Sequence, residues 1–284
     1  AGIYCLNRRR LVNEMYFNPP TSFDDLVRLC AIHWHGAFEM FSENDSRYCF
    51  QEDIMRDAMA CGFSESEADD LRRAVGKKQT EKLELYRPRW VAKYGEASWQ
   101  TMTEQGLYAY PKAHAVAYVM MAFRIAWFKV HRPLAFYATY FSIRAKAFDA
   151  EYCCAGIDAV KRKIREIENN KDATDVEQNL LVTLEVCYEF YLRGFTFETI
   201  DIYRSDATHF RITGEDSLLP PFVTVRGLGE TAAEATVRQR EGKEFISIEE
   251  FSSTCNKLSK THIEQLKNLG AFAGMAETSQ VSFF

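Results

Sequence analysis

The sequence of 284 residues lacks any apolar run long enough to span a membrane. Its longest run, AVAYVMMAF at residues 115–123, ends at Arg124, well short of the roughly 20 apolar residues that a span requires. No apolar stretch follows the arginines at residues 8–10, so no signal peptide is predicted. The chain begins with Ala1 rather than Met, and we expect it to be part of a longer gene product in the cytoplasm.

Paired cysteine motifs are also missing. The eight cysteines are scattered without a C-x-x-C motif or a histidine pair at zinc spacing, which favours reduced thiols over a disulfide framework. His33 and His35 have no third ligand at a recognisable spacing, so no metal site is predicted. No Ser-His-Asp or Cys-His arrangement indicates a nucleophilic enzyme.

An overall excess of positive charge is absent, but basic residues are concentrated locally. The net charge of −5 argues against a globally basic nucleic-acid-binding protein. Residues 72–93 nevertheless hold eight basic side chains against two acidic ones, and residues 112–132 hold four basic side chains and no acidic one. This distribution indicates a localised site for a polyanion. The alternative is a pair of solvated helix faces.

Helical periodicity dominates most of the chain. Helices are predicted over residues 20–33, 64–76, 112–131, 149–170 and 175–194. The helix over 112–131 is apolar on nearly all sides, so we expect it to be buried and central, with Pro133 breaking or restarting it. Residues 195–212 alternate apolar and polar side chains, which predicts two or three short strands. Helical pairs return at about 223–273, and a loose tail is expected after them.

The most specific local motif is VRGLGETAAEATVRQR. Gly227 and Gly229 flank Leu228 and precede an alanine-rich helix, the pattern of a helix–hairpin–helix. The glycines permit a tight turn and leave backbone N–H groups at the next helix N-terminus free to bind a phosphate oxygen. Such contacts hold DNA without reading its bases, and Arg238 and Arg240 would add charge. An ordinary αα-hairpin is the alternative.

Two further stretches carry residues suited to phosphate. Lys112 and His114 begin the helix over 112–131, where a cation, an imidazole and a helix N-terminus favour an anion such as a triphosphate. Arg124 projects from a later turn, and the alternative for His114 is a core histidine. The second stretch, LRRAVGKKQ, has basic pairs on both sides of a glycine, which suits phosphate recognition. These residues are Arg72, Arg73, Lys77 and Lys78.

With these motifs in order, the chain resembles the C-terminal part of the C-family replicative DNA polymerases, the bacterial DNA polymerase III alpha subunits, and most closely those of PolC type. YPKAHAVAYVMMAFRIAWFKVHRP is similar to the family's fingers helix, and LRRAVGKK is similar to a basic fingers block. LLPPFVTVRGLG and KLSKTHIEQLKNLGAF resemble its duplex-binding domain.

The resemblance implies a mainly α fold with a small β element. It implies a fingers region over residues 1–148, followed by a duplex-DNA-binding domain over 149–273. The helix–hairpin–helix would lie at about 218–273, and residues 274–284 would form a flexible tail. Lys112, His114 and Arg124 would face the incoming nucleotide, and the basic fingers block would reach the triphosphate or the template backbone. The glycine hairpin would hold duplex phosphates.

The resemblance also implies a reaction, the template-directed transfer of a nucleotide to a primer 3′-hydroxyl. In the family, palm aspartates in a D-x-D block hold Mg²⁺ for this chemistry, and this chain has no D-x-D. We therefore expect the parent protein to be the enzyme and this chain alone to be inactive. The implied partners are template–primer DNA, a deoxynucleoside triphosphate and the rest of the polymerase chain (palm, thumb and exonuclease), with no membrane partner.

The last residues, SQVSFF, resemble the short peptide with which PolC-type polymerases bind a ring-shaped sliding clamp. Apolar anchors on a tail suit a pocket on another protein. The anchors would be Gln280, Ser282, Phe283 and Phe284, with Phe283 in place of the family's leucine. Two alternatives to a polymerase part remain, a stand-alone helix–hairpin–helix DNA-binding module and a clamp-binding adaptor.

Overall fold

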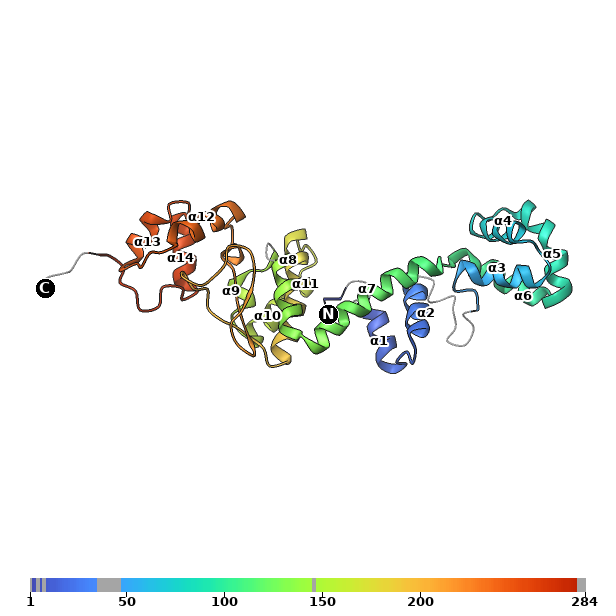
Figure 1. Ribbon diagram of the computed structural model, residues 1–284, viewed down its shortest axis with the longest axis horizontal. Coiled ribbons are helices and arrows are strands. Elements are labelled where there is room, and N and C mark those ends of the chain that lie inside the picture. Colours follow the sequence, from blue (N-terminus) through green and yellow to red (C-terminus); the bar gives the residue numbers. More distant parts are fainter. Residues whose placement is uncertain (1, 4–5, 7–8, 35–46, 145–146, 280–284) are drawn as a thin grey trace. The chain divides into compact units, whose positions relative to one another are not determined.

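The computed structural model describes residues 2–3, 6, 9–34, 47–144 and 147–279, which divide into two compact units (Figure 1). One unit holds Ile3–Ala126, and the other holds the chain from Trp127 onward together with Gly2. The division falls inside a helix, whereas the sequence prediction placed it between residues 148 and 149.

The first unit is helical. Its helices are α1 (Arg9–Phe17), α2 (Phe23–Trp34), α3 (Gln51–Ala60), α4 (Glu65–Gly76), α5 (Thr80–Tyr94), α6 (Glu96–Gln105), the 3₁₀ helix η2 (Gly106–Tyr108) and most of α7 (Lys112–His131). A capping box begins α4, where Ser64 accepts from the Glu67 N–H and the Glu67 carboxylate accepts from the Ser64 N–H. Gly95, with φ of 83°, allows the turn from α5 to α6.

Two apolar clusters hold the first unit together. Helices α3 to α6 pack around the fully buried Trp90, Ile54 and Leu71. Helices α1 and α2 pack on the N-terminal half of α7 through Val27, Val119 and other buried side chains. Burying aromatic and aliphatic side chains of this size stabilises a fold by roughly 1.5–3 kcal/mol each.

Helix α7 differs from the prediction. It spans the predicted residues, but Ala115, Val119, Ala122 and Lys129 are its only buried side chains among the described residues. The expectation of a buried central helix is therefore wrong, because a single narrow stripe meets the rest of the fold. By length and composition α7 could cross a membrane, with a mean hydropathy of 1.2. One such helix is weak evidence of a span, because core helices of soluble proteins meet the same criterion.

The second unit combines helices with a small sheet. After the end of α7 come α8 (Pro133–Ile143), α9 (Ala150–Cys153), α10 (Ile157–Asn169), α11 (Asp175–Leu192), β1 (Thr196–Phe197), β2 (Arg211–Ile212), β3 (Ser217–Leu219), the 3₁₀ helix η4 (Phe222–Thr224), α12 (Glu230–Arg240), α13 (Ile248–Thr254) and α14 (Lys260–Asn268). The mainly α class with a small β element is confirmed. The sheet order is β1-β3-β2, with β1 parallel and β2 antiparallel to β3.

Local chemistry explains most element boundaries in the second unit. Pro133 occupies the first turn of α8, as predicted, since a proline needs no N–H partner there. Gly194, with φ of 84°, follows the end of α11. The single helix expected over 149–170 is instead two, because Gly156 adopts φ of 92° between α9 and α10. Strand β3 lies beyond the predicted strand region, after the turn at residues 213–216.

A charged group at the end of α7 ties three helices of the second unit together. Lys129 Nζ lies 2.6 Å from Glu189 Oε1 of α11, and the Tyr137 hydroxyl of α8 donates to the same oxygen at 2.6 Å. Arg193 donates to the Lys129 carbonyl at 3.1 Å. Burial alone would raise the pKa of the Glu189 carboxyl, but the hydrogen bonds from Lys129 and Tyr137 hold its pKa well below its usual range.

The first part of the expected loose tail is docked. The Ile248 N–H donates to the Ala276 carbonyl at 2.9 Å, and the Ser247 and Ser279 hydroxyls lie 2.7 Å apart. Lys267 also pairs with Glu277 at 2.7 Å. Residues 276–279 thus satisfy the N-terminal end of α13 and belong to the folded unit.

We predict that Glu189→Gln lowers the free energy of unfolding by about 2–3 kcal/mol at pH 7, because Lys129 then stays buried without its counter-ion. The Glu189 carboxyl has a lower pKa in the folded state than in the unfolded state. Its ion pair therefore stabilises the fold at pH values above the unfolded-state pKa of about 4.3, and this stabilisation is lost as the pH falls. Urea unfolding of the 284-residue chain should therefore show the gap between wild type and variant narrowing from pH 7 to pH 3.

The matched control is Glu185→Gln, which changes an exposed carboxylate one turn earlier on α11. This variant should unfold like the wild type at pH 7. A Glu189→Gln gap that stays constant down to pH 3 would contradict the role assigned to the ion pair.

Candidate nucleic-acid interface

The glycine hairpin lies between η4 and α12. Gly227 adopts φ of 79°, a left-handed conformation that favours glycine, while Gly229 has an ordinary φ of −74°. The Leu228 N–H donates to the Val225 carbonyl at 3.0 Å and closes the turn. Leu228 is buried, and both glycines are exposed. The turn therefore presents backbone to solvent while one leucine anchors it.

Helix α12 begins without a side-chain cap. Its N-cap residue is Gly229, which has no side chain to accept from the first N–H groups of the helix. Helices α4, α11, α13 and α14 each begin with a serine or threonine that does accept such a hydrogen bond. The exposed start of α12 thus has donors and a partial positive charge for an anion.

The two arginines predicted to bind DNA on α12 have different environments. The Arg238 side chain is 67% exposed and lies 3.7 Å from Glu234 on the same helix. Arg240 is buried, and its guanidinium donates to the carbonyls of Ile202, at 2.6 Å, and Ser205. It also lies 5.1 Å above the Phe222 ring. Arg240 therefore joins the loop after β1 to α12, and its buried guanidinium is not available to contact DNA.

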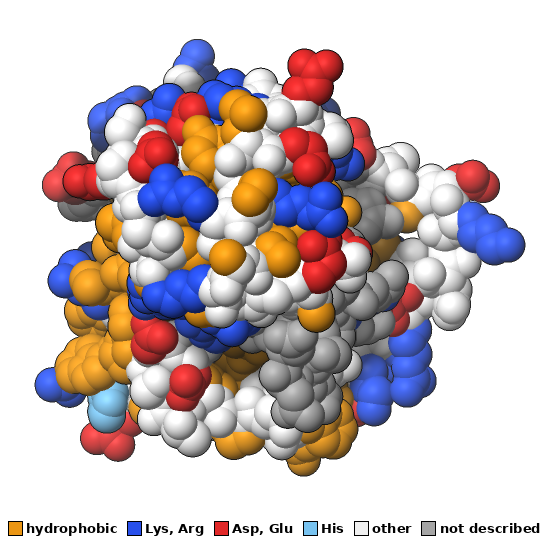
Figure 2. Space-filling view, turned by 90° about the vertical axis from the view of Figure 1, so that its right-hand side faces the viewer, with side chains coloured by type: hydrophobic (Ala, Val, Ile, Leu, Met, Phe, Trp, Pro, Cys, Tyr) orange, Lys and Arg blue, Asp and Glu red, His pale blue; other side chains and the backbone are white. Residues whose placement is uncertain are grey.

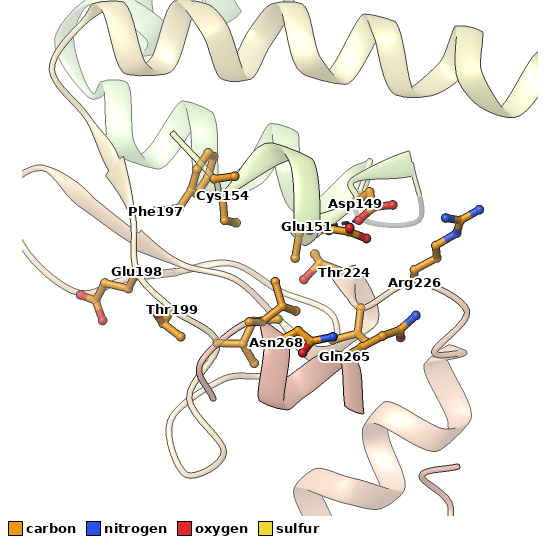
Figure 3. Close-up of a pocket in the computed structure, with 15 residues that line it drawn as sticks. Asp149, Glu151, Cys154, Phe197, Glu198, Thr199, Thr224, Arg226, Gln265 and Asn268 are labelled. Atoms are coloured by element: carbon orange, nitrogen blue, oxygen red, sulfur yellow. Dashed lines mark hydrogen bonds between the residues drawn. The ribbon is translucent and has the colours of Figure 1, made fainter. Parts of the chain in front are cut away.

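A hollow of about 520 Å³ lies beside the hairpin, between α9 and α14 (Figure 3). Asp149 and Glu151 line it from the α9 side, and Gln265 lines it from α14. Arg226 extends from its edge, away from the other labelled side chains (Figure 3). Burial raises the pKa of the Asp149 carboxyl. With more carboxylates than cations in its lining, this hollow does not suit a phosphate, whereas the exposed hairpin next to it does.

The basic fingers block is largely neutralised by its neighbours. Arg73 lies 2.7 Å from Asp69, and Arg72 pairs with the same carboxylate. Over residues 65–96 the chain has eight basic and seven acidic side chains, so the apparent excess depended on where the window began. Figure 2, which faces this end of the first unit, shows blue and red side chains interspersed. Lys77 and Lys78, at the end of α4, are exposed and have no ion-pair partner among the described residues.

The start of α3 connects this block to the start of α7. Arg72 donates to the Gln51 side chain at 2.8 Å, and the Gln51 N–H donates to the Tyr110 carbonyl at 3.0 Å. The Lys112 N–H donates to the Glu52 carboxylate at 2.9 Å. The structure therefore brings Arg72 and Lys112 to one region. Sequence reasoning missed Gln51 and Glu52, which join the two stretches, since neither belongs to a recognisable motif.

The remaining predicted nucleotide-binding residues lie on α7. Lys112 Nζ is 2.9 Å from Asp24 and 5.2 Å from the centre of the Phe50 ring, so its charge is partly balanced. His114 is exposed, and its ring lies 4.7 Å from that of Tyr118. Arg124 is also exposed, but a helical rise of about 1.5 Å per residue puts it about 18 Å along α7 from Lys112. Arg124 and Lys112 therefore do not converge on one phosphate.

The predicted clamp anchors at residues 280–284 lie outside the described residues, as does His35. Within the described part of the chain, no group of three or more His, Cys, Asp or Glu side chains is placed to hold a metal ion. None of the described groups therefore fits an Mg²⁺ site.

Comparison with known proteins agrees with this geometry. Residues 194–281 match the family model of the helix–hairpin–helix motif, and residues 36–97 match that of the bacterial DNA polymerase III alpha subunit finger domain. The fold and the hairpin thus define a finger and helix–hairpin–helix region of a bacterial DNA polymerase III alpha subunit.

Three relatives identify the type. The chain is 41% identical over 282 residues to the DNA polymerase III PolC-type of Caldanaerobacter subterraneus subsp. tengcongensis, covering 93% of this chain and 20% of the relative. It is 51% identical over 178 residues to that of Lactococcus lactis subsp. lactis and 49% over 180 residues to that of Streptococcus pneumoniae, covering 62% of this chain and 11% and 12% of the relatives. The chain belongs to the PolC-type family and spans a fifth or less of these relatives' length.

We predict that Arg240→Ala lowers the free energy of unfolding by about 2–3 kcal/mol, because two carbonyls lose a charged donor. Arg238→Ala, two residues earlier on the exposed face, should unfold like the wild type. Thermal or urea unfolding of the two variants checks this, and equal stability of both would contradict the buried role of Arg240.

Proposed function

We propose that this chain is the part of a replicative DNA-directed DNA polymerase that holds the template–primer duplex and positions the incoming nucleotide. The observation that carries the proposal is the exposed Gly227 hairpin before an uncapped helix, inside a region that matches the helix–hairpin–helix model. Backbone N–H groups at such a turn bind phosphate oxygens of DNA whatever its base sequence. That property suits a polymerase, which must hold every DNA sequence that it copies.

The nucleotide would be bound by the first unit. Lys77 and Lys78 are exposed at the end of α4, and His114 is exposed on the first turn of α7. Lysine acts as a point charge toward a triphosphate, and an imidazole can donate to one of its oxygens. The ligands of the catalytic Mg²⁺ would come from the rest of the polymerase chain, so the chemistry would belong to the whole protein.

A sliding clamp would be a further partner of the whole protein. The proposal rests on the sequence of residues 280–284, which has the form of the family's clamp-binding peptide. The preceding Ser279 contacts Ser247, so the peptide would extend from a fixed point at α13. Two phenylalanines at the end of a peptide supply the aromatic anchors that hydrophobic pockets bind well.

We predict that the 284-residue chain binds duplex DNA with an affinity that falls steeply with salt, and that Gly227→Val weakens binding about tenfold or more. Valine cannot adopt φ of 79° without strain, so the N–H groups of the turn move away from the phosphate. Fluorescence anisotropy with a labelled duplex over a range of salt concentrations measures both effects.

Gly242→Val is the matched control. Gly242 also has a left-handed φ, of 70°, with open space around it, but it lies in the loop after α12. This variant should carry a similar strain and keep its DNA affinity. Equal affinities of both variants and the wild type, or binding that ignores salt, would contradict the proposed duplex contact.

We further predict that deleting residues 280–284 abolishes capture by an immobilised bacterial sliding clamp and leaves DNA affinity unchanged. Residues 276–279, which contact the start of α13, are retained in this variant. Clamp capture that survives the deletion would place the clamp anchor elsewhere.

A further inference from the structure

The second helix of the motif brings a histidine to the glycine hairpin. His262 is the third residue of α14, and a Cβ atom at Gly227 would lie 3.9 Å from His262 Nε2. The His262 side chain is partly exposed, as are the backbone atoms of Gly227. The start of α14 and the turn before α12 therefore share one surface, although 34 residues lie between Gly227 and His262 in the chain.

The hydrogen bonds at the start of α14 determine which imidazole nitrogen carries the proton. The Ser259 N–H donates to His262 Nδ1 at 3.2 Å, and the His262 N–H donates to the Ser259 hydroxyl at 3.2 Å. Because Nδ1 accepts a hydrogen bond, the neutral ring carries its proton on Nε2. The nitrogen that faces Gly227 is therefore a hydrogen-bond donor.

We propose that His262 Nε2 donates to the same DNA phosphate that the Gly227 hairpin binds. This inference rests on the proposed function and adds to it a contact from a second helix. A phosphate offers only acceptor oxygens, so a fixed N–H beside the backbone donors fits its chemistry. The Ser259 backbone N–H holds the ring in place, which lowers the entropy lost on binding.

The donor differs in kind from the arginines nearby. Arg226 and Arg238 are exposed cations, and each would release counter-ions from DNA on binding. An imidazole whose Nδ1 accepts a hydrogen bond carries no charge and displaces no counter-ion. Its loss should therefore weaken binding without changing the dependence on salt, a signature that separates His262 from a charged contact.

The test compares three variants of the 284-residue chain in the anisotropy assay. His262→Leu removes the donor and half of the capping box, and we expect it to weaken duplex binding about tenfold with an unchanged salt slope. Ser259→Ala removes the hydroxyl half of the box but keeps Nε2–H, so it should bind DNA like the wild type. His262→Gln supplies both an acceptor for the Ser259 N–H and an amide donor, and it should also retain affinity.

Thermal unfolding of the same variants separates binding from folding. His262→Leu and Ser259→Ala both disrupt the cap, so both should be destabilised, yet only the first should lose affinity. Equal affinity losses in the two, or a loss in His262→Gln as large as in His262→Leu, would reduce His262 to a capping residue. If Gly227→Val weakens binding and His262→Leu does not, this inference fails and the proposed function stands. If the wild type does not bind DNA, the proposed function itself fails.

Discussion

The second unit depends on a partly buried carboxylate that pairs with a buried cation. Glu189 of α11 receives both Lys129 of α7 and the Tyr137 hydroxyl of α8, so one oxygen fixes three helices. Removing a cation from water is costly unless such a partner compensates it. Arg240 shows the same constraint in the helix–hairpin–helix region, where backbone carbonyls replace the carboxylate. These two basic side chains hold the fold together, and neither has its charge available for DNA.

Ion pairing also determines which basic side chains of the first unit can bind an anion. Arg72, Arg73 and Lys112 have carboxylate partners, while Lys77 and Lys78 face solvent without one among the described residues. A polyanion attracted to this surface would compete with aspartates for the paired side chains and meet the unpaired lysines directly. Nonspecific DNA binding on a chain of net charge −5 is consistent with this arrangement, because a few exposed donors at one turn suffice to hold a phosphate.

The hairpin and the second helix of the motif act as one surface. Gly227 supplies a backbone that approaches a ligand closely, and Leu228 anchors that backbone in the core. His262 reaches the turn from α14 and is held by its own capping box. The fold can therefore place donors from two distant segments around one phosphate, and residues 276–279 complete the unit by covering the start of α13.

The sequence by itself determined several helix boundaries and the position of the glycine turn before α12. Ser64 caps a helix, Pro133 begins one, and Gly194 follows the end of one with a left-handed φ. These residues mark boundaries because each effect acts within a few residues of the chain. Only the tertiary structure decided how the charges pair, that Arg240 is buried, that α7 is largely exposed, and that His262 meets Gly227. Those outcomes depend on contacts between residues far apart in the chain, and neither periodicity nor spacing contains that information.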